Sequence, residues 1–248
     1  MAAAHHMTNQ GVSDVCELLE WDTSHFGFTI ARTTESRPDA RLMGDVLEWC
    51  NLHGVRCAYH LADPSRPTAL EAASDAGFKL VDIRHELVVD TENVSCEARE
   101  FGVVSRIAST EDLPALSGLA REAAVMSRFM RDRGFPADRV DAMYDTWVRE
   151  ALAANMLIVA PAAGVPAGFL AMRIAAGAAR ILLLAVHPLS RGNRMGATLV
   201  RDAIVHAYSA GATEVSVVTQ GHNVPALRTY EDAGMRTSRV SLWYHRWF

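Results

Sequence analysis

ILLLAVHPLSRGNRMGATLV, residues 181–200, joins an apolar run to a helix through a loop that carries two arginines and two glycines. The apolar run has no polar alternation, which indicates a central strand covered on both faces. A helix N-terminus presents unpaired N–H groups and the positive end of the helix dipole, so it receives phosphate well. Glycines let a ligand approach the backbone, and arginines add charge. The stretch therefore predicts an anion site, although its spacing fits neither a Walker loop nor G-x-G-x-x-G.

Strands and helices alternate along the rest of the chain. We expect helices over 40–54, 66–77, 109–123, the later part of 127–153, 196–211 and 223–234. We expect strands over 28–31, 56–63, 78–90, 102–108, 156–160, 166–174, 179–186, 214–220 and 239–247, with a loop over 17–27. Ser109 and Asp112 have capping-box spacing, and Asn223 fits a helix cap before Pro225. The fold class is therefore α/β, or α+β with a mixed sheet.

Two segments of the chain echo each other. ALEAASDAGF (69–78) and ALRTYEDAGM (226–235) share A-L-x-x-x-x-D-A-G, each a short helix stopped by glycine before a strand. Chance could produce this, because Ala and Leu are common helix formers. The alternative is that the N-terminal part is a reduced copy of the C-terminal part, with Ala73 in the place of Tyr230. With the polar stretch 90–100 as linker, the sequence predicts two lobes, 8–100 and 101–248.

Composition excludes several classes of protein. The 248 residues carry a formal charge of −5 and are half hydrophobic, so no broad basic face for nucleic acid is expected. The longest uncharged run, 156–172, contains two prolines and two glycines and does not predict a membrane span. Four cysteines without a C-x-x-C pair predict neither a zinc site nor a disulfide framework, which favours a reduced cytoplasm. The opening MAAAHHM is typical of an added tag rather than a signal peptide.

As a unit, residues 181–200 resemble the acyl-CoA-binding signature of the GCN5-related N-acetyltransferase (GNAT) superfamily. That signature is a strand ending in L-x-V-x-P, then R/Q-x-x-G-x-G/A and a helix, and Leu184, Val186, Pro188, Arg191 and Gly196 match it. The resemblance implies a GNAT fold, with acetyl-CoA or another short acyl-CoA as co-substrate and no metal. The residues that it implies for coenzyme binding are Leu184, Ala185, Val186, Arg191, Gly192, Asn193, Arg194, Met195, Gly196, Ala197 and Asn223.

One position departs from the signature. Arg194 stands where the family usually has its middle glycine. A β-carbon at this position could crowd the pyrophosphate of the coenzyme, and the added cation could compensate.

The last unit, VVTQGHNVPALRTYEDAG, resembles the family's final conserved unit, in which an asparagine and a tyrosine lie seven residues apart. Seven residues turn a helix by about 700°, so Asn223 and Tyr230 share a face. The resemblance implies that Tyr230 is the general acid toward the coenzyme A thiolate, at a cost of about 2 kcal/mol from reference pKa values. Alternatively, its ring only packs against strands. His187 and His222 are weak candidates for a base, and we expect water to accept the amine proton.

Within the superfamily, LEWDTSHFGF (19–28) and SRFMRDRGFP (127–136) resemble the dTDP-fucosamine acetyltransferase type, which acetylates the 4-amino group of a nucleotide-linked 4-amino-4,6-dideoxy sugar. The implied acceptor-binding residues are Trp21, Phe26, Gly27, Arg128 and Phe129. Equally, Trp21 and Phe26 could pack between the two halves and Arg128 could form a surface ion pair. The side chains of 131–133 are expected to be solvated.

The prediction is therefore a direct acetyl transfer in a ternary complex, since no nucleophile–base pair predicts a covalent intermediate. Two alternatives remain open at this point: an acyltransferase for another amine, such as an antibiotic or a protein N-terminus, and a non-catalytic acyl-CoA sensor. Small molecules are the expected partners, without nucleic acid or membrane. An exposed closing strand, 239–247, could also pair across a dimer axis.

Overall fold

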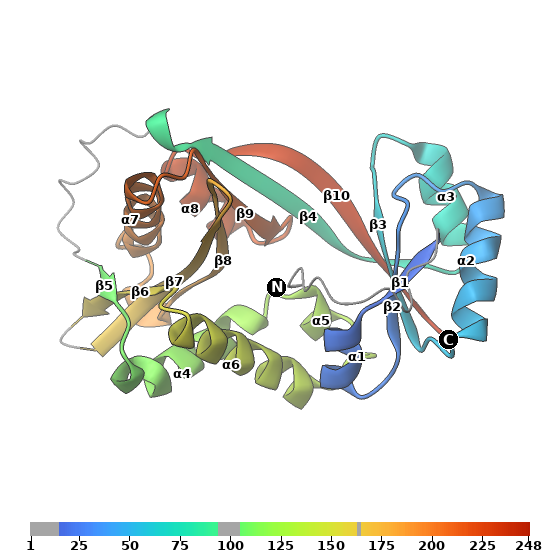
Figure 1. The fold of residues 1–248 in the computed structure, drawn as a ribbon, viewed down its shortest axis with the longest axis horizontal. Helices are drawn as coiled ribbons and strands as arrows, with labels where there is room; N and C mark the ends of the chain where they lie inside the picture. Colours follow the sequence, from blue (N-terminus) through green and yellow to red (C-terminus); the bar gives the residue numbers. More distant parts are fainter. Residues whose placement is uncertain (1–14, 94–104, 163–164) are drawn as a thin grey trace. The chain divides into compact units, whose positions relative to one another are not determined.

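A computed structural model describes residues 15–93, 105–162 and 165–248 (Figure 1). The chain forms two compact units. Unit 1 contains the chain up to Arg84, Arg131–Arg139 and Val240–Phe248, and unit 2 contains His85–Met130 and Val140–Arg239. The predicted boundary at 100/101 and most of the predicted linker lie outside the described residues, so the division into lobes at that point stays a prediction.

Unit 1 is an α/β unit with four neighbouring strands. Its elements are β1 (Cys16–Leu18), α1 (Glu20–Phe26), β2 (Ile30–Thr33), α2 (Ala40–Leu52), β3 (Cys57–Ala62), α3 (Pro67–Asp75), the start of β4 (Lys79–Asp90) and most of β10 (Arg236–Trp247). The strand order is β1-β2-β3-β10, with β2 and β3 parallel and the other pairs antiparallel.

Two predictions fail in unit 1. Residues 20–26 form α1 rather than a loop; Leu19 at its N-cap offers no side-chain hydrogen bond, so the usual start signal is missing. The closing strand is not an exposed edge, because β10 lies between β3 and β4 in the strand order. Pairing of this strand across a dimer axis is therefore wrong as a route to a dimer.

Unit 2 contains the remaining strands and helices. They are β5 (Arg106–Ile107), α4 (Leu113–Ala124), α5 (Arg128–Arg131), α6 (Ala137–Ala153), β6 (Leu157–Ala162), β7 (Val165–Ala175), β8 (Ala178–Val186), α7 (Met195–Ser209), β9 (Glu214–Gln220) and α8 (Val224–Asp232). The strand order is β4-β9-β8-β7-β6-β5, with β8 and β9 parallel. The mixed sheet confirms the predicted class, and the Ser109–Asp112 capping box is present.

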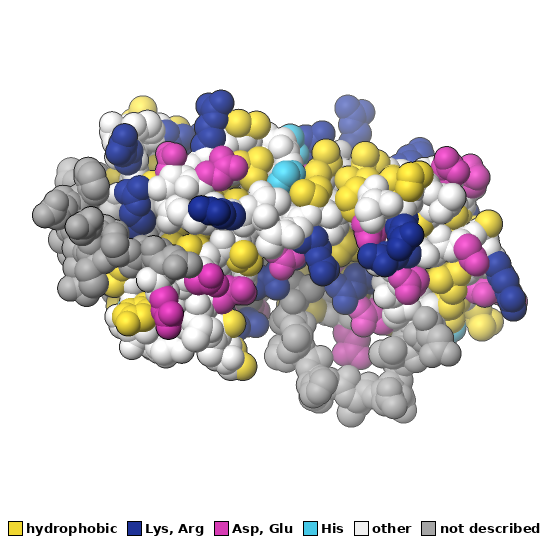
Figure 2. Space-filling model, turned by 90° about the horizontal axis from the view of Figure 1, so that it is seen from above, with side chains coloured by type: hydrophobic (Ala, Val, Ile, Leu, Met, Phe, Trp, Pro, Cys, Tyr) yellow, Lys and Arg dark blue, Asp and Glu magenta, His cyan; other side chains and the backbone are white. Residues whose placement is uncertain are grey.

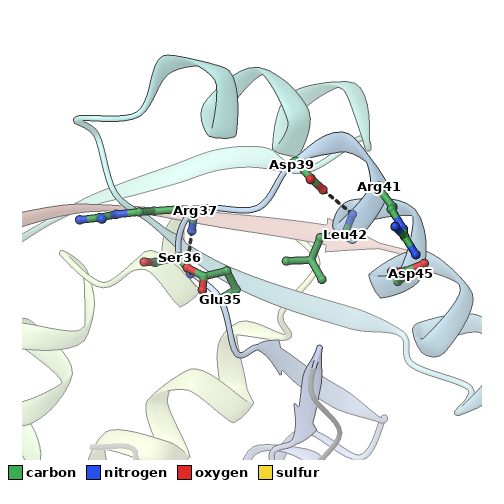
Figure 3. Close-up of a pocket in the computed structure, with 7 residues that line it drawn as sticks. All are labelled: Glu35, Ser36, Arg37, Asp39, Arg41, Leu42 and Asp45. Atoms are coloured by element: carbon green, nitrogen blue, oxygen red, sulfur yellow. Dashed lines mark hydrogen bonds between the residues drawn. The ribbon is translucent and has the colours of Figure 1, made fainter.

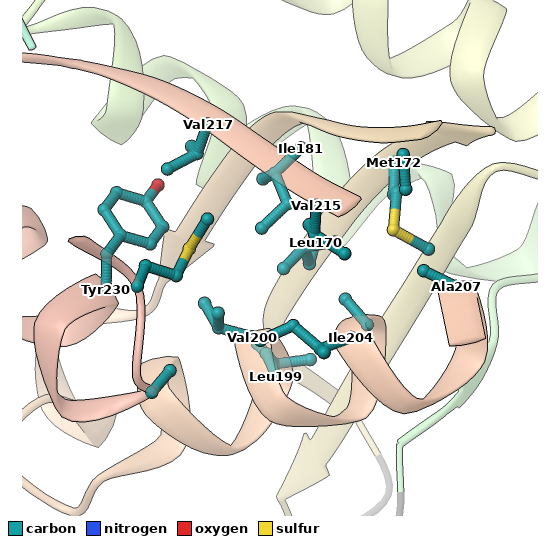
Figure 4. Packing of buried hydrophobic residues seen from close by; sticks show 14 of the residues in the cluster. Leu170, Met172, Ile181, Leu199, Val200, Ile204, Ala207, Val215, Val217 and Tyr230 are labelled. Carbon is teal, nitrogen blue, oxygen red and sulfur yellow. The ribbon is translucent and has the colours of Figure 1, made fainter. Parts of the chain in front are cut away.

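The core of unit 2 lies between α7 and the sheet, as Figure 4 shows. The buried face of α7 includes Leu199 and Ile204, which pack with Leu170 of β7 and Val217 of β9. Each such side chain contributes about 1.5–3 kcal/mol when it is removed from water. On the opposite face α4 contacts β7 and β8 (Figure 1). Strands β7 and β8, which precede the anion loop, are thus packed against α7 and α4.

The echo between 69–78 and 226–235 has a structural counterpart. Helices α3 and α8 both end at a glycine with positive φ, 79° and 91° respectively. The residue after each glycine donates its N–H to an equivalent carbonyl in the last turn of the helix. Phe78 N–H donates to the Ala73 carbonyl and Met235 N–H to the Tyr230 carbonyl, both at 3.0 Å. A glycine is needed at such left-handed stops because a β-carbon is strained there.

Surface charge is mixed on the face shown in Figure 2. There, Lys and Arg side chains lie among acidic and apolar ones rather than in one broad patch. Over the described ranges, no helix is both long and apolar enough to cross a membrane.

Candidate active site

Strands β8 and β9 separate after pairing over their first halves. Their parallel register runs from Ala178 opposite Glu214 to Ile181 opposite Val217, after which β8 continues to Val186 and β9 to Gln220 without further pairs among the described residues. We call this separation the fork. Leu182, Leu183 and Leu184 at its edge are half-buried, so the prediction of a strand covered on both faces is wrong for this end.

At the fork, some backbone N–H groups of β8 face the side from which β9 has separated. His187 N–H donates to Ala167 O of β7 at 2.8 Å. Alternate residues of an antiparallel strand point the same way, so the Ala185 N–H also faces β7. The N–H groups of Leu184 and Val186 then face the opposite edge, where β9 has left. Of the three β8 residues predicted for coenzyme binding, Leu184 and Val186 therefore direct their N–H groups into the fork.

The loop after β8 leaves the N-terminus of α7 uncapped. Arg194 occupies the N-cap position in the left-handed conformation, φ +57°, and its side chain makes no capping hydrogen bond. Gly192 also has a positive φ, +81°. Both residues and Asn193 are exposed, whereas Met195 and Ala197 are buried. A helix of 15 residues thus presents its first N–H groups beside an exposed arginine, which suits an anion.

Arg191 ties this loop to the end of β8. Its Nε donates to the Val186 carbonyl at 3.1 Å, and a terminal nitrogen lies 3.8 Å from Glu122 Oε2. Both members of this ion pair are more than half exposed, so the pair contributes little to stability. Arg191 can therefore exchange Glu122 for a stronger anion at small cost.

Gly196 is explained by the packing of two helices. A β-carbon added there would lie 3.0 Å from Thr229 Cγ2 of α8. Glycine lets α7 approach α8 closely, and α8 carries Tyr230. Gly196 thus allows the start of α7 to pack closely against the helix that carries Tyr230.

Tyr230 lies in the core of unit 2 with 5% of its surface exposed. Figure 4 shows its hydroxyl oxygen pointing toward Val217, the last residue of β9 that pairs with β8. The hydroxyl therefore lies at the base of the fork. Burial raises the pKa of Tyr230 above its ordinary value, so the phenol keeps its proton throughout the neutral range.

The other polar residues near the loop have local roles. Asn223 caps α8, its side-chain oxygen accepting from Ala226 N–H at 3.3 Å. His187 accepts from Leu189 N–H at 3.3 Å through Nδ1, as a loop histidine does. The predicted position of Asn223 as the cap of α8 is confirmed. Its contact with the coenzyme remains a prediction.

Three predicted acceptor residues lie on α1 in unit 1. Trp21 stacks on His25 with ring centroids 4.9 Å apart. Phe26 is buried and meets Phe135 edge-on at 4.7 Å. Gly27 ends α1 in the left-handed conformation, φ +80°. Phe26 is thus explained by packing within unit 1 and Gly27 by its left-handed conformation, while Trp21 stays partly accessible.

The other two predicted acceptor residues lie in unit 2. The Arg128 guanidinium lies 4.1 Å from the ring centroid of Phe129, a cation–π contact. Phe129 is buried and Arg128 is half-buried. Phe129 therefore anchors the short helix α5, and Arg128 is the member of the pair that a ligand can reach.

Unit 1 contains an open hollow of about 700 Å³ at the N-terminus of α2 (Figure 3). It is lined by Glu35, Ser36, Arg37, Asp39, Arg41, Leu42 and Asp45. Here the backbone N–H groups are occupied by carboxylates. Glu35 accepts from Ser36 and Arg37 at 2.7 and 2.8 Å, and Asp39 caps α2 by accepting from Leu42 at 2.8 Å. This hollow does not suit an anion, because the backbone N–H groups beside it are already paired with carboxylates.

Within the part of the chain that the structure describes, no three His, Cys, Asp or Glu side chains gather as a metal site would require.

Comparison with known proteins gives consistent results. The pattern of the acetyltransferase (GNAT) family matches residues 124–235. The chain is 31% identical over 238 residues to the dTDP-fucosamine acetyltransferase of Escherichia coli O6:H1 (strain CFT073), covering 93% of this chain and 97% of that protein. It is 30% identical over 138 residues to the spore coat polysaccharide biosynthesis protein SpsD of Bacillus subtilis (strain 168), covering 55% and 48%.

A solved structure shares the fold. The GCN5-related N-acetyltransferase from Sphaerobacter thermophilus superposes with a TM-score of 0.65 over 94% of this chain and 76% of that one, at 15% identity. This likeness concerns the fold alone.

Proposed function

The chain belongs to the GNAT acetyltransferase family, and on that basis we propose that it transfers the acetyl group of acetyl-CoA to the amine of a dTDP-linked amino-deoxy sugar. As a member of this family it is an acyl-CoA-dependent N-acetyltransferase. The observation that carries the acceptor is the 31% identity to a dTDP-fucosamine acetyltransferase along 93% of the chain. By that similarity, a 4-amino-4,6-dideoxyhexose is the first substrate to test.

The N-terminus of α7 would hold the diphosphate of the coenzyme. Its first N–H groups have no side-chain cap, and Arg194 and Arg191 add positive charge on the loop. Arg191 would leave Glu122 for the diphosphate, since an exposed ion pair at 3.8 Å is weak. The loop residues Gly192 and Asn193 are exposed and would line the same site.

The fork would hold the thioester. Leu184 and Val186 would direct N–H groups at the acetyl carbonyl oxygen as negative charge grows on it during attack. Backbone donors fixed in place before reaction are effective because they do not have to reorganise, and losing one donor typically costs about 10²–10³ in rate. The fork is the feature of β8 that makes these donors available.

Tyr230 would assist the departing thiolate. The amine nitrogen forms its bond to the carbonyl carbon while the carbon–sulfur bond breaks, and the sulfur then needs a proton. Because burial raises the pKa of Tyr230, full proton transfer is more costly than reference values suggest. Tyr230 would therefore act mainly as a hydrogen-bond donor to sulfur, with solvent completing protonation.

The acceptor amine would lose its proton to water. His187 is engaged by Leu189 and lies in an exposed loop, which does not suit a base held against substrate. Arg128 would bind the diphosphate of the nucleotide sugar, since a guanidinium pairs well with phosphate. Trp21, partly accessible on α1, offers a stacking surface for a ring.

The deciding experiment is thiol release from acetyl-CoA with dTDP-4-amino and dTDP-3-amino deoxysugars, aminoglycosides and peptides as acceptors. We expect turnover with one nucleotide sugar and none with the other classes. Turnover only with an aminoglycoside or a peptide would keep the enzyme class and overturn the acceptor. Binding of acetyl-CoA without turnover on any acceptor would instead favour a longer acyl donor or a sensor.

A further inference from the structure

Asp132, which the sequence places in a solvated loop, is largely enclosed. Only 11% of its side chain is exposed. Its carboxylate lies 2.6 Å from His245 Nδ1 and accepts from Trp247 Nε1 at 3.0 Å and from Gly134 N–H at 3.0 Å. Burial opposes ionisation, yet the hydrogen bonds from His245, Gly134 and Trp247 outweigh it and lower the pKa of Asp132. We call Asp132, His245 and Trp247 the clamp.

Packing around the clamp is equally specific. A β-carbon on Gly134 would lie 2.1 Å from the Trp247 ring, so the chain passes directly over the indole. Phe135 meets Trp247 edge-on at 5.0 Å and His245 at 5.7 Å. His245 in turn stacks on Tyr59 of β3 at 4.7 Å. The segment Arg131–Arg139 is therefore an integral part of unit 1.

The clamp follows directly on α5. This helix is a single turn, Arg128–Arg131, and one turn has no stability of its own in water. On its entry side, Ser127 Oγ accepts from Met130 N–H at 3.2 Å and Phe129 is buried. On its exit side the next residue is Asp132. The direction of Arg128 thus depends on how both ends of this single turn are held.

We propose that Asp132 is a positioning residue for acceptor binding: the clamp fixes the exit of α5 and thereby the direction of Arg128. This inference rests on the proposed function, because it assigns Arg128 to the nucleotide sugar. It predicts a selective effect. Loosening the clamp weakens acceptor binding and leaves acetyl-CoA binding at α7 unchanged.

The test compares Asp132→Asn with Asp138→Asn, an exposed carboxylate of the same segment. For Asp132→Asn we expect the acceptor KM to rise about tenfold or more, with kcat within a few-fold of wild type and an unchanged Kd for acetyl-CoA, since a charge-assisted hydrogen bond is lost. Tryptic cleavage after Arg131 and Arg133 should accelerate. Asp138→Asn should match the wild type in all four measurements.

A second pair of variants covers the case in which Asp132→Asn does not fold. His245→Asn keeps an N–H donor near the position of Nδ1, whereas His245→Phe keeps a ring over Tyr59 and loses the donor. We expect the acceptor KM to rise with Phe and to stay near wild type with Asn. An equal KM in both variants would overturn the role of the hydrogen bond.

The outcomes separate this inference from the proposed function. If the wild type neither binds nor acetylates any dTDP-amino sugar, the proposed function fails and the acceptor role of the clamp fails with it. If the wild type binds the sugar and Asp132→Asn binds it equally well, only the clamp inference fails. Equal loss of acetyl-CoA and acceptor binding would show a general structural role instead.

Discussion

The stretch β2–α2–β3–α3–β4 in unit 1 and the stretch β8–α7–β9–α8–β10 have the same order of elements, the same parallel first pair and the same glycine stop. They differ in which backbone hydrogen-bonding groups they leave without a partner inside the stretch. In the first, β2 pairs with β3 from Ile30 to Arg32, and Asp39 caps α2. In the second, β8 leaves β9 at the fork and α7 has no side-chain cap.

A third difference lies in the last helix. Ala73 is completely buried in α3, and Tyr230 takes the corresponding place in α8 with its hydroxyl at the base of the fork. The comparison teaches that a site arises where a fold gives up hydrogen bonds that it could make internally. Each omission costs about 1 kcal/mol in the free protein, a cost that a ligand can repay by binding.

The strongest test of this comparison removes the tyrosine hydroxyl. We expect Tyr230→Phe to fold normally and to lose about 10²- to 10⁴-fold in kcat, as removal of a positioned proton or hydrogen-bond donor typically does. Steady-state thiol release measures the effect. Tyr208→Phe is the control, because Tyr208 is 58% exposed near the end of α7. Full activity in Tyr230→Phe would reduce the tyrosine to a packing residue.

Unit 1 should be the acid-sensitive region. His60 is completely buried, with Thr33 Oγ1 2.8 Å from Nδ1, and burial lowers its pKa to about 4 against the opposing charge of Glu35. The unfolded chain takes up this proton near pH 6.5, so stability present above that value falls as pH drops toward 4, by about 3 kcal/mol. Denaturant unfolding at pH 7 and 4.5 measures the loss.

His60→Asn provides the matched variant, because its amide can retain the bond to Thr33 without titrating. The free energy of unfolding should then depend less on pH between 6.5 and 4. An unchanged pH dependence would assign the acid sensitivity to other groups.

Arginines in the two helix N-terminal regions should differ in their effect on coenzyme binding. We expect Arg191→Ala to weaken acetyl-CoA binding about tenfold, as loss of a charge-assisted contact does. Arg37→Ala should have no effect, because Glu35 and Asp39 occupy the amides beside it. Calorimetry should give one acetyl-CoA per chain; a second molecule bound with similar affinity would contradict the comparison.

The smallest effect concerns the left-handed residue of the loop. Arg194→Gly should stabilise the fold by up to about 1 kcal/mol, because a left-handed β-carbon is removed. Arg194→Ala keeps that strain and loses the charge. Both variants should bind acetyl-CoA a few-fold more weakly if the guanidinium contacts the diphosphate. Equal stability of the two variants would show that the loop relaxes around the side chain.

Local signals predicted most of the fold. Strands β6 to β9 and helices α7 and α8 follow from apolar runs, caps and glycine stops that lie within a few residues of one another. Helix α1 was not predicted from the sequence, because Leu19 at its N-cap provides no capping signal. The fork was not predicted either, because the apolar sequence of β8 does not show where its pairing with β9 ends.

Long-range partners explain the remaining errors. Asp132 was assigned to solvent because the residue that orders it, His245, lies 113 positions away. A signal was present in the closing strand, where Trp243, His245 and Trp247 alternate and so share one face. Gly134 beside Asp132 could also have suggested a close approach.

Strands β4 and β10 each run through both compact units, and this has a consequence for inheritance. Residues 85–90 of β4 bring Leu87 and Val89 into the core of unit 2, and residues 240–247 of β10 bring Tyr244 into that of unit 1. Each unit therefore takes part of its core from a strand that it shares with the other unit. A gene segment that encodes one unit therefore cannot be lost without removing core residues of the other.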